Sequence, residues 1–204
     1  MQPLIIDLTG KKVVIAGGGR IAARKAKVLS AEKALITFIA PEISEEVRIH
    51  AKEHNYELIE RAALPSDFSG AMLVILATNS RAVNGSLAKI LPANQLVCVV
   101  DESGDGNVTF PATVRRGPLQ IAVTSNGSSP KLTRKLKREL EKQFDESWIG
   151  YTDWLYEMRE KVKQLDLSHE EKQQILWDIL EDEYKEETAR QHLLSEGRLN
   201  GMPG

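Results

Sequence analysis

Three consecutive glycines, Gly17 to Gly19, are the residues whose spacing points most directly to chemistry. They follow a short apolar run and precede a small residue, Ala22, so the segment reads as a strand, a tight turn and a helix. The first glycine permits the turn, Gly19 lets backbone approach a pyrophosphate, and Ala22 lets helix pack on strand. The N–H groups at such a helix start favour anions, which predicts a dinucleotide site, although a glycine-rich turn without a ligand is the alternative. The positions expected to hold the pyrophosphate are Gly17, Gly18, Gly19, Arg20 and Ile21.

Two further turns are candidates for the same cofactor site. The second apolar run ends in alanine rather than in the acid that usually binds the ribose hydroxyls, so Glu42, after Pro41, is the nearest candidate for that role. No Lys or Arg lies within residues 41–47 to bind a 2′-phosphate, which favours NAD over NADP. Thr78 and Asn79 end another strand and are expected to line the cleft, unless they only terminate that strand.

The second half of the chain is divided by charge. Residues 111–142 carry eight basic and two acidic residues, a net charge of +6, whereas residues 151–204 carry seven basic and thirteen acidic residues, a net charge of −6. Two solvated helix faces would give the same division. The functional interpretation is a basic wall beside the nucleotide site, suited to a substrate with several carboxylates.

Composition excludes several classes of protein. The 204 residues carry a net charge of −2, so overall charge gives no argument for binding nucleic acid or membranes. No apolar run reaches the roughly 20 residues of a membrane span, and the N-terminus does not resemble a signal peptide. A single cysteine, Cys98, fits a core residue in a reducing compartment, so a cytoplasmic protein is expected. The four histidines show no recognisable ligand cluster, and no metal site is predicted.

Elements that would position these residues alternate along the first half. Alternating strands and helices indicate an α/β domain with a doubly wound parallel sheet, which we place at residues 1–107. The expected strands are 13–16, 35–40, 56–59, 71–78 and 95–101, and the expected helices are 20–30, 43–55 and 81–91.

The pattern changes after a turn-rich stretch at residues 102–107. Two strands, 109–115 and 119–124, are expected to pair as a hairpin, and a basic helix follows within a central region of residues 108–147. Residues 148–204 read as helical, and Ser168 with Glu171 fits a capping box that begins another helix.

With these residues in view, the chain resembles the precorrin-2 dehydrogenase family of siroheme biosynthesis, a module that also forms the N-terminal part of siroheme synthases. The motifs that carry the resemblance are AGGGRIAARKAKVL, ATNSRAVN and VVDESGDGNVTFPATVRRGPLQIAVTSNGSSPKLTRKLKREL. The resemblance implies a Rossmann-like NAD-binding domain, a small α+β dimerisation region and a helical C-terminal domain. It also implies a homodimer that oxidises precorrin-2 to sirohydrochlorin with NAD+.

The resemblance assigns roles to single residues. Asp101 matches the aspartate at the end of the family's VVD strand, where a carboxylate within reach of the substrate could accept its proton. A turn-forming role before the following glycine is the alternative for Asp101. The turn at residues 125–129 matches the family's small segment before Ser-Pro. Candidates for binding the substrate's carboxylates and for that turn are Arg115, Arg116, Ser125, Ser128, Lys131, Arg134, Lys135 and Arg138.

Two departures and two alternatives accompany the resemblance. Cys98 stands where many members carry asparagine, and Asn126 stands where glycine is common. The first alternative adds insertion of Fe2+ into sirohydrochlorin, because some members do this. The second is a regulatory module that senses NAD without chemistry, because a dinucleotide fold does not by itself imply catalysis.

Overall fold

The computed structural model describes residues 1–100 and 105–195, and the chain divides into two compact units. The first unit is Met1–Phe110 and the second begins at Pro111. Each unit has its own hydrophobic clusters and is described by itself.

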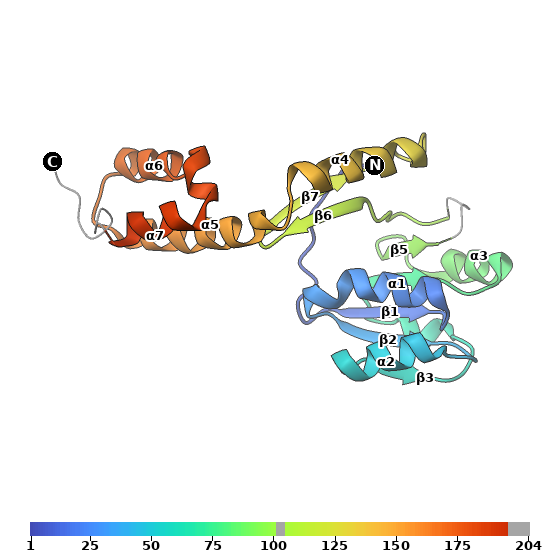
Figure 1. Cartoon of the computed structure of the whole chain (residues 1–204). Helices are drawn as coiled ribbons and strands as arrows, with labels where there is room; N and C mark the ends of the chain where they lie inside the picture. The colour runs from blue at the N-terminus through green and yellow to red at the C-terminus, as the bar shows by residue number, and fades with distance from the viewer. Residues whose placement is uncertain (101–104, 196–204) are drawn as a thin grey trace. The chain divides into compact units, whose positions relative to one another are not determined.

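A five-stranded parallel sheet forms the centre of the first unit, with the order β3-β2-β1-β4-β5 (Figure 1). Its strands are β1 (Lys12–Ala16), β2 (Leu35–Ile39), β3 (Glu57–Ile59), β4 (Leu73–Leu76) and β5 (Leu96–Val99). β2 pairs with one edge of β1 and β4 pairs with the other edge, so the strand order reverses direction at β1. Ligands of such sheets bind beyond the carboxyl ends of the strands at this switch point.

Helices cover both faces of this sheet, because β1 and β4 carry apolar side chains on both sides. On one face, α1 (Arg20–Leu29) and α2 (Glu45–His54) pack through Ala22, Ala26 and Val47 against Ile15 and Ile75. On the other face, α3 (Arg81–Ile90) and the short 3-10 helix η2 (Pro65–Phe68) pack against the remaining strand side chains. The doubly wound parallel sheet expected from the sequence is therefore confirmed.

The second unit begins with an antiparallel hairpin of β6 (Ala112–Arg116) and β7 (Leu119–Val123). Gly117 and Pro118 make its two-residue turn, and Gly117 has a φ of +56°, as a primed hairpin turn requires. The strand expected from residue 109 begins three residues later, because Pro111 has no N–H and the N–H groups of Asn107 and Val108 donate to Val97 O instead.

Helices complete the second unit: α4 (Pro130–Gln143), α5 (Ser147–Gln164), α6 (His169–Asp178), the 3-10 helix η3 (Asp182–Lys185) and α7 (Glu187–Ser195). Tyr151, Trp154 and Met158 of α5 are buried against Ile179 and Leu193. The capping box at the start of α6 is confirmed, since Ser168 Oγ accepts from Glu171 N and Glu171 Oε2 accepts from Ser168 N.

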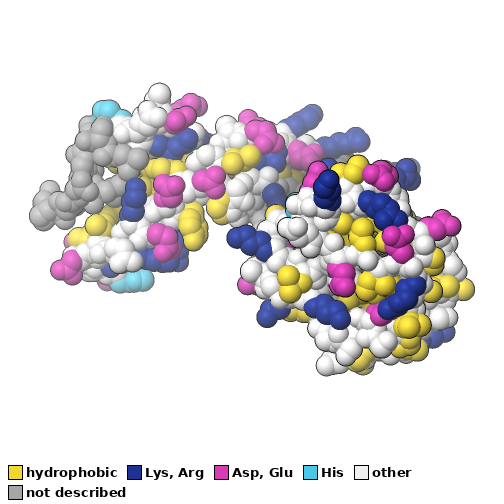
Figure 2. All heavy atoms as spheres, turned by 90° about the horizontal axis from the view of Figure 1, so that it is seen from below, with side chains coloured by type: hydrophobic (Ala, Val, Ile, Leu, Met, Phe, Trp, Pro, Cys, Tyr) yellow, Lys and Arg dark blue, Asp and Glu magenta, His cyan; other side chains and the backbone are white. Residues whose placement is uncertain are grey.

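Basic and acidic side chains are interspersed with apolar ones on the face shown in Figure 2. Within the described ranges, none of the helices combines the length and the apolar character that crossing a bilayer would need.

Candidate functional site

The glycine loop between β1 and α1 is shaped by close backbone contacts. Gly17 has a φ of +142°, and a Cβ at this position would lie 2.3 Å from Ala77 O. A Cβ at Gly18 would lie 2.1 Å from Glu42 O. These two glycines are therefore required by the packing of three neighbouring loops, whatever ligand binds there.

Gly19 differs from both, because a Cβ at Gly19 would meet nothing within 4 Å. The position lies at the start of α1, where Ala23 N donates to Gly19 O and the preceding N–H groups have no partner in the helix. Gly18 O accepts from Ser44 N at 2.9 Å, which fixes this loop to the loop after β2. The open space beside Gly19 fits an approaching pyrophosphate, and the helix start supplies the N–H groups and positive dipole end.

A cleft of about 710 Å³ opens at the carboxyl ends of β1, β2 and β4. Seven of the nine positions expected to bind the cofactor line it, whereas Arg20 and Ile21 are exposed at the start of α1 and lie outside the lining. The seven are Gly17, Gly18, Gly19, Pro41, Glu42, Thr78 and Asn79. Sequence reasoning did not include the remaining wall, made by Ile39, Ala40, Ile43, Ser44, Ala62, Ala63, Ala77, Ser80, Val83 and Leu87.

Asn84 positions the third loop of the cleft and was also missed. Its side chain is 1% exposed, and its Oδ1 accepts from Thr78 N at 3.1 Å and from Thr78 Oγ1 at 2.6 Å. Asn84 Nδ2 donates back to Thr78 O at 3.3 Å. The fully buried amide thereby holds the Thr78 to Ser80 turn against the start of α3. The signal was present in the ATNSRAVN motif, as an asparagine one turn into an otherwise apolar helix face.

Among the described residues that line the cleft, Glu42 alone has a charged side chain. Two nearby arginines are engaged elsewhere: Arg48 donates to both carboxylate oxygens of Glu60, and Arg61 donates to both oxygens of Asp67. The Arg48 guanidinium holds the pKa of Glu60 below its usual value through these hydrogen bonds. The cleft therefore offers a carboxylate, not a cation, near the loop after β2.

Cys98 lies in the core, as expected from its apolar surroundings, with 4% of its surface exposed. Burial raises the pKa of its thiol, so the neutral form is favoured. Lys25 of α1 is nearby, and burial lowers the pKa of its ammonium group, which lies 4.2 Å from the centre of the Phe110 ring. These features describe a structural residue rather than a reactive thiolate.

The expected catalytic residue, Asp101, lies outside the described residues. The described chain reaches Val100, whose N–H donates to Leu76 O at the end of β4. The chain thus leaves the sheet at the carboxyl end of β5, at Val99, two residues before Asp101.

Basic side chains form a groove of about 390 Å³ along α4 in the second unit. It is lined by Lys131, Arg134, Lys135, Arg138, Glu139 and Lys142, so five of its six side chains are cationic. Four of the substrate candidates belong to this set, and all four are exposed. The groove is suited to several carboxylates at once.

The other four substrate candidates lie close to the ends of the hairpin. Ser125 Oγ accepts from Ser129 N, and Ser128 Oγ donates to Ser125 O, so both serines shape the turn that starts α4. Arg116 Nε donates to Asp145 O at 2.8 Å and Nη1 donates to Arg115 O at 2.7 Å, with the side chain 12% exposed. The Arg116 guanidinium is thereby committed to the connection between α4 and α5. Arg115 is half-buried at the end of β6.

The structure brings together three possible metal ligands that the sequence analysis did not group. The histidines were expected to form no ligand cluster, but His50, Glu53 and His54 bring one ligand atom each to within 4.8 Å of one another. The spacing of three and four residues places all three on one face of α2. The helix predicted over residues 43–55 would already have placed His50, Glu53 and His54 on one face.

Family models match all three regions of the chain. Residues 4–112 match a family described as NAD(P)-binding, residues 116–143 match the sirohaem biosynthesis protein central family, and residues 148–193 match the SirC C-terminal domain family.

Individual relatives are similar over nearly their whole lengths. The chain is 33% identical over 191 residues to the precorrin-2 dehydrogenase of Priestia megaterium, and this alignment covers 94% of this chain and 95% of that protein. It is 38% identical over 161 residues to the precorrin-2 dehydrogenase of Bacillus subtilis, which covers 79% of this chain and 99% of that protein. The solved structure of SirC, precorrin-2 dehydrogenase, superimposes with a TM-score of 0.85 at 32% identity, covering 96% of this chain and 98% of that chain.

Proposed function

This chain belongs to the precorrin-2 dehydrogenase family of siroheme biosynthesis, and we propose that NAD+ bound in the glycine-lined cleft accepts the hydride in its reaction. The chain is a nicotinamide-dependent oxidoreductase that oxidises precorrin-2 to sirohydrochlorin. The oxidation removes two hydrogens from the macrocycle, one as a hydride and one as a proton. The single observation that carries the cofactor site is the open space at Gly19, beside two glycines that backbone packing requires.

The choice of NAD+ over NADP+ rests on charge near the loop after β2. Glu42 lines the cleft there, and the described lining residues include no Lys or Arg. A carboxylate can accept hydrogen bonds from ribose hydroxyls, whereas it repels a 2′-phosphate. Calorimetric titration should therefore give at least tenfold tighter binding of NAD+ than of NADP+, and Glu42→Gln should narrow that difference. Equal affinities in the unmodified chain would contradict this assignment.

Asp101 is proposed as the group that takes the proton. Its support is its place in the chain, two residues after β5 ends at Val99, because open parallel sheets bind their ligands beyond the carboxyl ends of the strands. An ionised carboxylate there would accept a proton from the macrocycle carbon while the hydride leaves to the nicotinamide ring. Such a base typically contributes on the order of 10²–10⁴-fold to the rate.

The carboxylates of precorrin-2 are proposed to bind along α4. Lys131, Arg134, Lys135 and Arg138 supply the cations, and the serine turn at Ser125 and Ser128 fixes the start of the helix. Arg115 stays a candidate at the edge of the hairpin. For Arg116 we propose a positioning role, because its guanidinium already bonds to the α4 to α5 connection.

We further propose that the protein is a homodimer in the cytoplasm. The hairpin is only two strands wide, and Leu132 and Leu136 of α4 are 47% and 37% exposed. An isolated two-stranded sheet is marginal in water, so a second copy is a suitable cover for these apolar side chains. The single buried free thiol agrees with a reducing compartment. Light scattering should give twice the mass of the chain, and a monomeric mass would contradict the dimer.

Iron insertion is the second activity that the family resemblance includes. No observation among the described residues favours it over the oxidation alone, so it forms no part of the proposal. Sirohydrochlorin and Fe2+ supplied without NAD+ test this alternative, because siroheme formed faster than in the reaction without enzyme would add iron insertion to the oxidation.

A further inference from the structure

A second group of side chains with ligand chemistry lies in the last two turns of α2. His50, Glu53 and His54 share one face of that helix, and one ligand atom from each lies within 4.8 Å of the others. The cofactor cleft is formed at the opposite end of α2, where Ser44 precedes the helix. The group is thus separate from the residues assigned to the oxidation.

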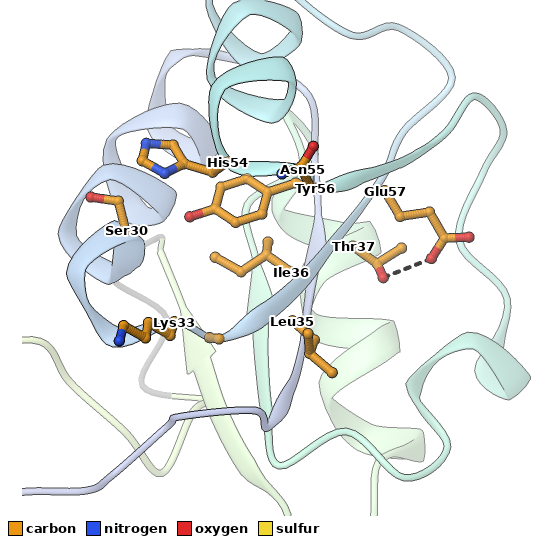
Figure 3. A pocket seen from close by; sticks show the side chains of 10 residues that line it. Ser30, Lys33, Leu35, Ile36, Thr37, His54, Asn55, Tyr56 and Glu57 are labelled. Carbon is orange, nitrogen blue, oxygen red and sulfur yellow. Dashed lines mark hydrogen bonds between the residues drawn. The ribbon is translucent and has the colours of Figure 1, made fainter.

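Aromatic packing holds the two imidazoles in place. The His50 side chain is 15% exposed, and its ring centre lies 4.5 Å from that of His54 at an interplanar angle of 71°. His54 stacks on Tyr56 with ring centres 5.3 Å apart. Figure 3 shows both side chains among those that line the adjoining pocket. Tyr56 in turn contacts the fully buried Phe38. The core of the first unit therefore limits the movement of both histidine rings.

The polar atoms of His50 are poorly satisfied in the described part of the chain. Its Nε2 is buried without a hydrogen-bond partner, and its Nδ1 lies 3.6 Å from Glu53 Oε2, beyond ordinary hydrogen-bond length. Buried polar atoms of this kind usually have a partner, so the His50 ring has unused bonding capacity at Nε2, while Nδ1 is the nitrogen that lies near the Glu53 carboxylate.

We propose that His50, Glu53 and His54 bind a divalent transition-metal ion of the Zn2+ class. Imidazole nitrogen and carboxylate oxygen are ligands that zinc takes at about 2.0–2.2 Å, which puts ligand atoms roughly 3.4 Å apart in a tetrahedral site. The ligand atoms need to close by roughly 1.4 Å from the present 4.8 Å limit to reach that spacing. The exposed Glu53 side chain and small rotations of the packed imidazoles can supply that movement. Two neutral imidazoles and one carboxylate leave a fourth position for water.

The place of the site on the helix favours a cation. His54 is the last residue of α2, and Asn55 follows in the left-handed conformation with its N–H donating to Ala51 O. The carbonyl groups of the last turn carry the negative end of the helix dipole, which stabilises positive charge there. A stacked aromatic surface cluster without an ion is the competing explanation of the same geometry.

Zinc titration of the full-length chain tests the proposal. Tag-free protein is treated with a chelator, dialysed and titrated with Zn2+ by calorimetry; we expect one Zn2+ per chain. Glu53→Gln and His54→Gln should each weaken binding at least tenfold, whereas His169→Gln, an exposed histidine on α6, should leave it unchanged. Because Glu53 and His54 are exposed, both variants should melt at the same temperature as the unmodified chain without metal.

Cobalt supplies a second measurement that reports on the ligands themselves. Co2+ in a tetrahedral site absorbs visible light, so the unmodified chain and His169→Gln should show this band and Glu53→Gln and His54→Gln should lose it. The NAD+ affinity of all four proteins should be the same, which separates this proposal from the oxidoreductase site. Lack of saturable Zn2+ binding at millimolar concentration, or binding that both cluster variants retain, would overturn the metal site.

Discussion

The two units of this chain build their candidate binding surfaces in opposite ways. In the first unit, backbone makes the cleft: Gly17 and Gly18 fit against carbonyl groups of neighbouring loops, and Gly19 leaves open space. In the second unit, side chains make the groove: five exposed cations extend from α4, and no residue of that helix is buried.

The difference concerns how each surface recognises its ligand. A backbone cradle is fixed by the fold, so added atoms either distort the protein or obstruct the ligand. A row of exposed cations attracts carboxylates through charge. Salt screens this attraction, and a single substitution weakens it only modestly. The first unit should therefore respond sharply to small steric changes, and the second should respond gradually to changes in charge.

The largest effect is expected at the chemical step. Asp101→Asn should lower kcat by about 10²-fold or more, because the amide cannot accept the proton. The affinity for NAD+ should be unchanged, since the cleft lining in the described residues is intact. Single-turnover kinetics with separate NAD+ titration measure the two effects. A variant with full kcat would return Asp101 to a turn-forming role.

Two alanine variants of the glycine loop should separate glycines that the fold requires from the glycine that the ligand requires. Gly17→Ala should destabilise the chain by about 3 kcal/mol, because positive φ and the contact with Ala77 O both oppose a Cβ. For a chain of this size that corresponds to a fall in Tm of roughly 6–12 °C. Gly19→Ala should leave Tm within about 2 °C and yet weaken NAD+ binding. Equal melting of the two variants would contradict this distinction between the glycines.

The groove in the second unit should respond to charge and salt. The double variant Lys131→Gln with Arg134→Gln should raise KM for precorrin-2 about tenfold with little change in kcat, because it removes uniform electrostatic attraction. The loss should shrink as salt is raised towards about 1 M. The double variant Arg159→Gln with Lys161→Gln on α5 is the control of equal charge change. An unchanged KM in the double variant would remove α4 from the substrate site.

The smallest effect concerns acid stability of the first unit. Hydrogen bonds from Arg61 lower the pKa of Asp67 below 3.8, so the ion pair stabilises the fold above the unfolded pKa and is lost as pH falls through the folded value. Asp67→Asn should lower Tm by about 2 °C at neutral pH, and the difference should shrink as the pH falls below the ordinary pKa of an aspartate and through the lowered folded pKa. Melting curves across pH measure this, and a difference that persists in acid would exclude the ion pair as its cause.

Features that depend on neighbouring residues in sequence were the ones that sequence could predict. The strand, glycine turn and helix around Gly17, and the capping box of Ser168 with Glu171, are specified within a few residues. The parallel sheet followed from buried apolar runs. The strand predicted from residue 109 was set too long, because β6 begins only at Ala112, after Pro111, which has no N–H to donate.

Features that depend on tertiary packing were missed. Asn84 becomes a loop anchor only because α3 places its amide beside Thr78, and Ala62 and Ala63 reach the cleft from the loop after β3. The engagement of Arg116 with Asp145 O joins residues 29 positions apart, which charge counting could not reveal. The cluster of His50, Glu53 and His54 is different, since helical spacing alone would have found it.

Anaerobic assay of the purified chain with precorrin-2 and NAD+ tests the central claim most directly, with Gly19→Asp as the paired variant. The unmodified chain should form NADH and sirohydrochlorin in a one-to-one ratio. Gly19→Asp should melt at a similar temperature and form neither, because its carboxylate would face the pyrophosphate. Formation of NADH at the full rate by Gly19→Asp, or none by the unmodified chain, would contradict the account.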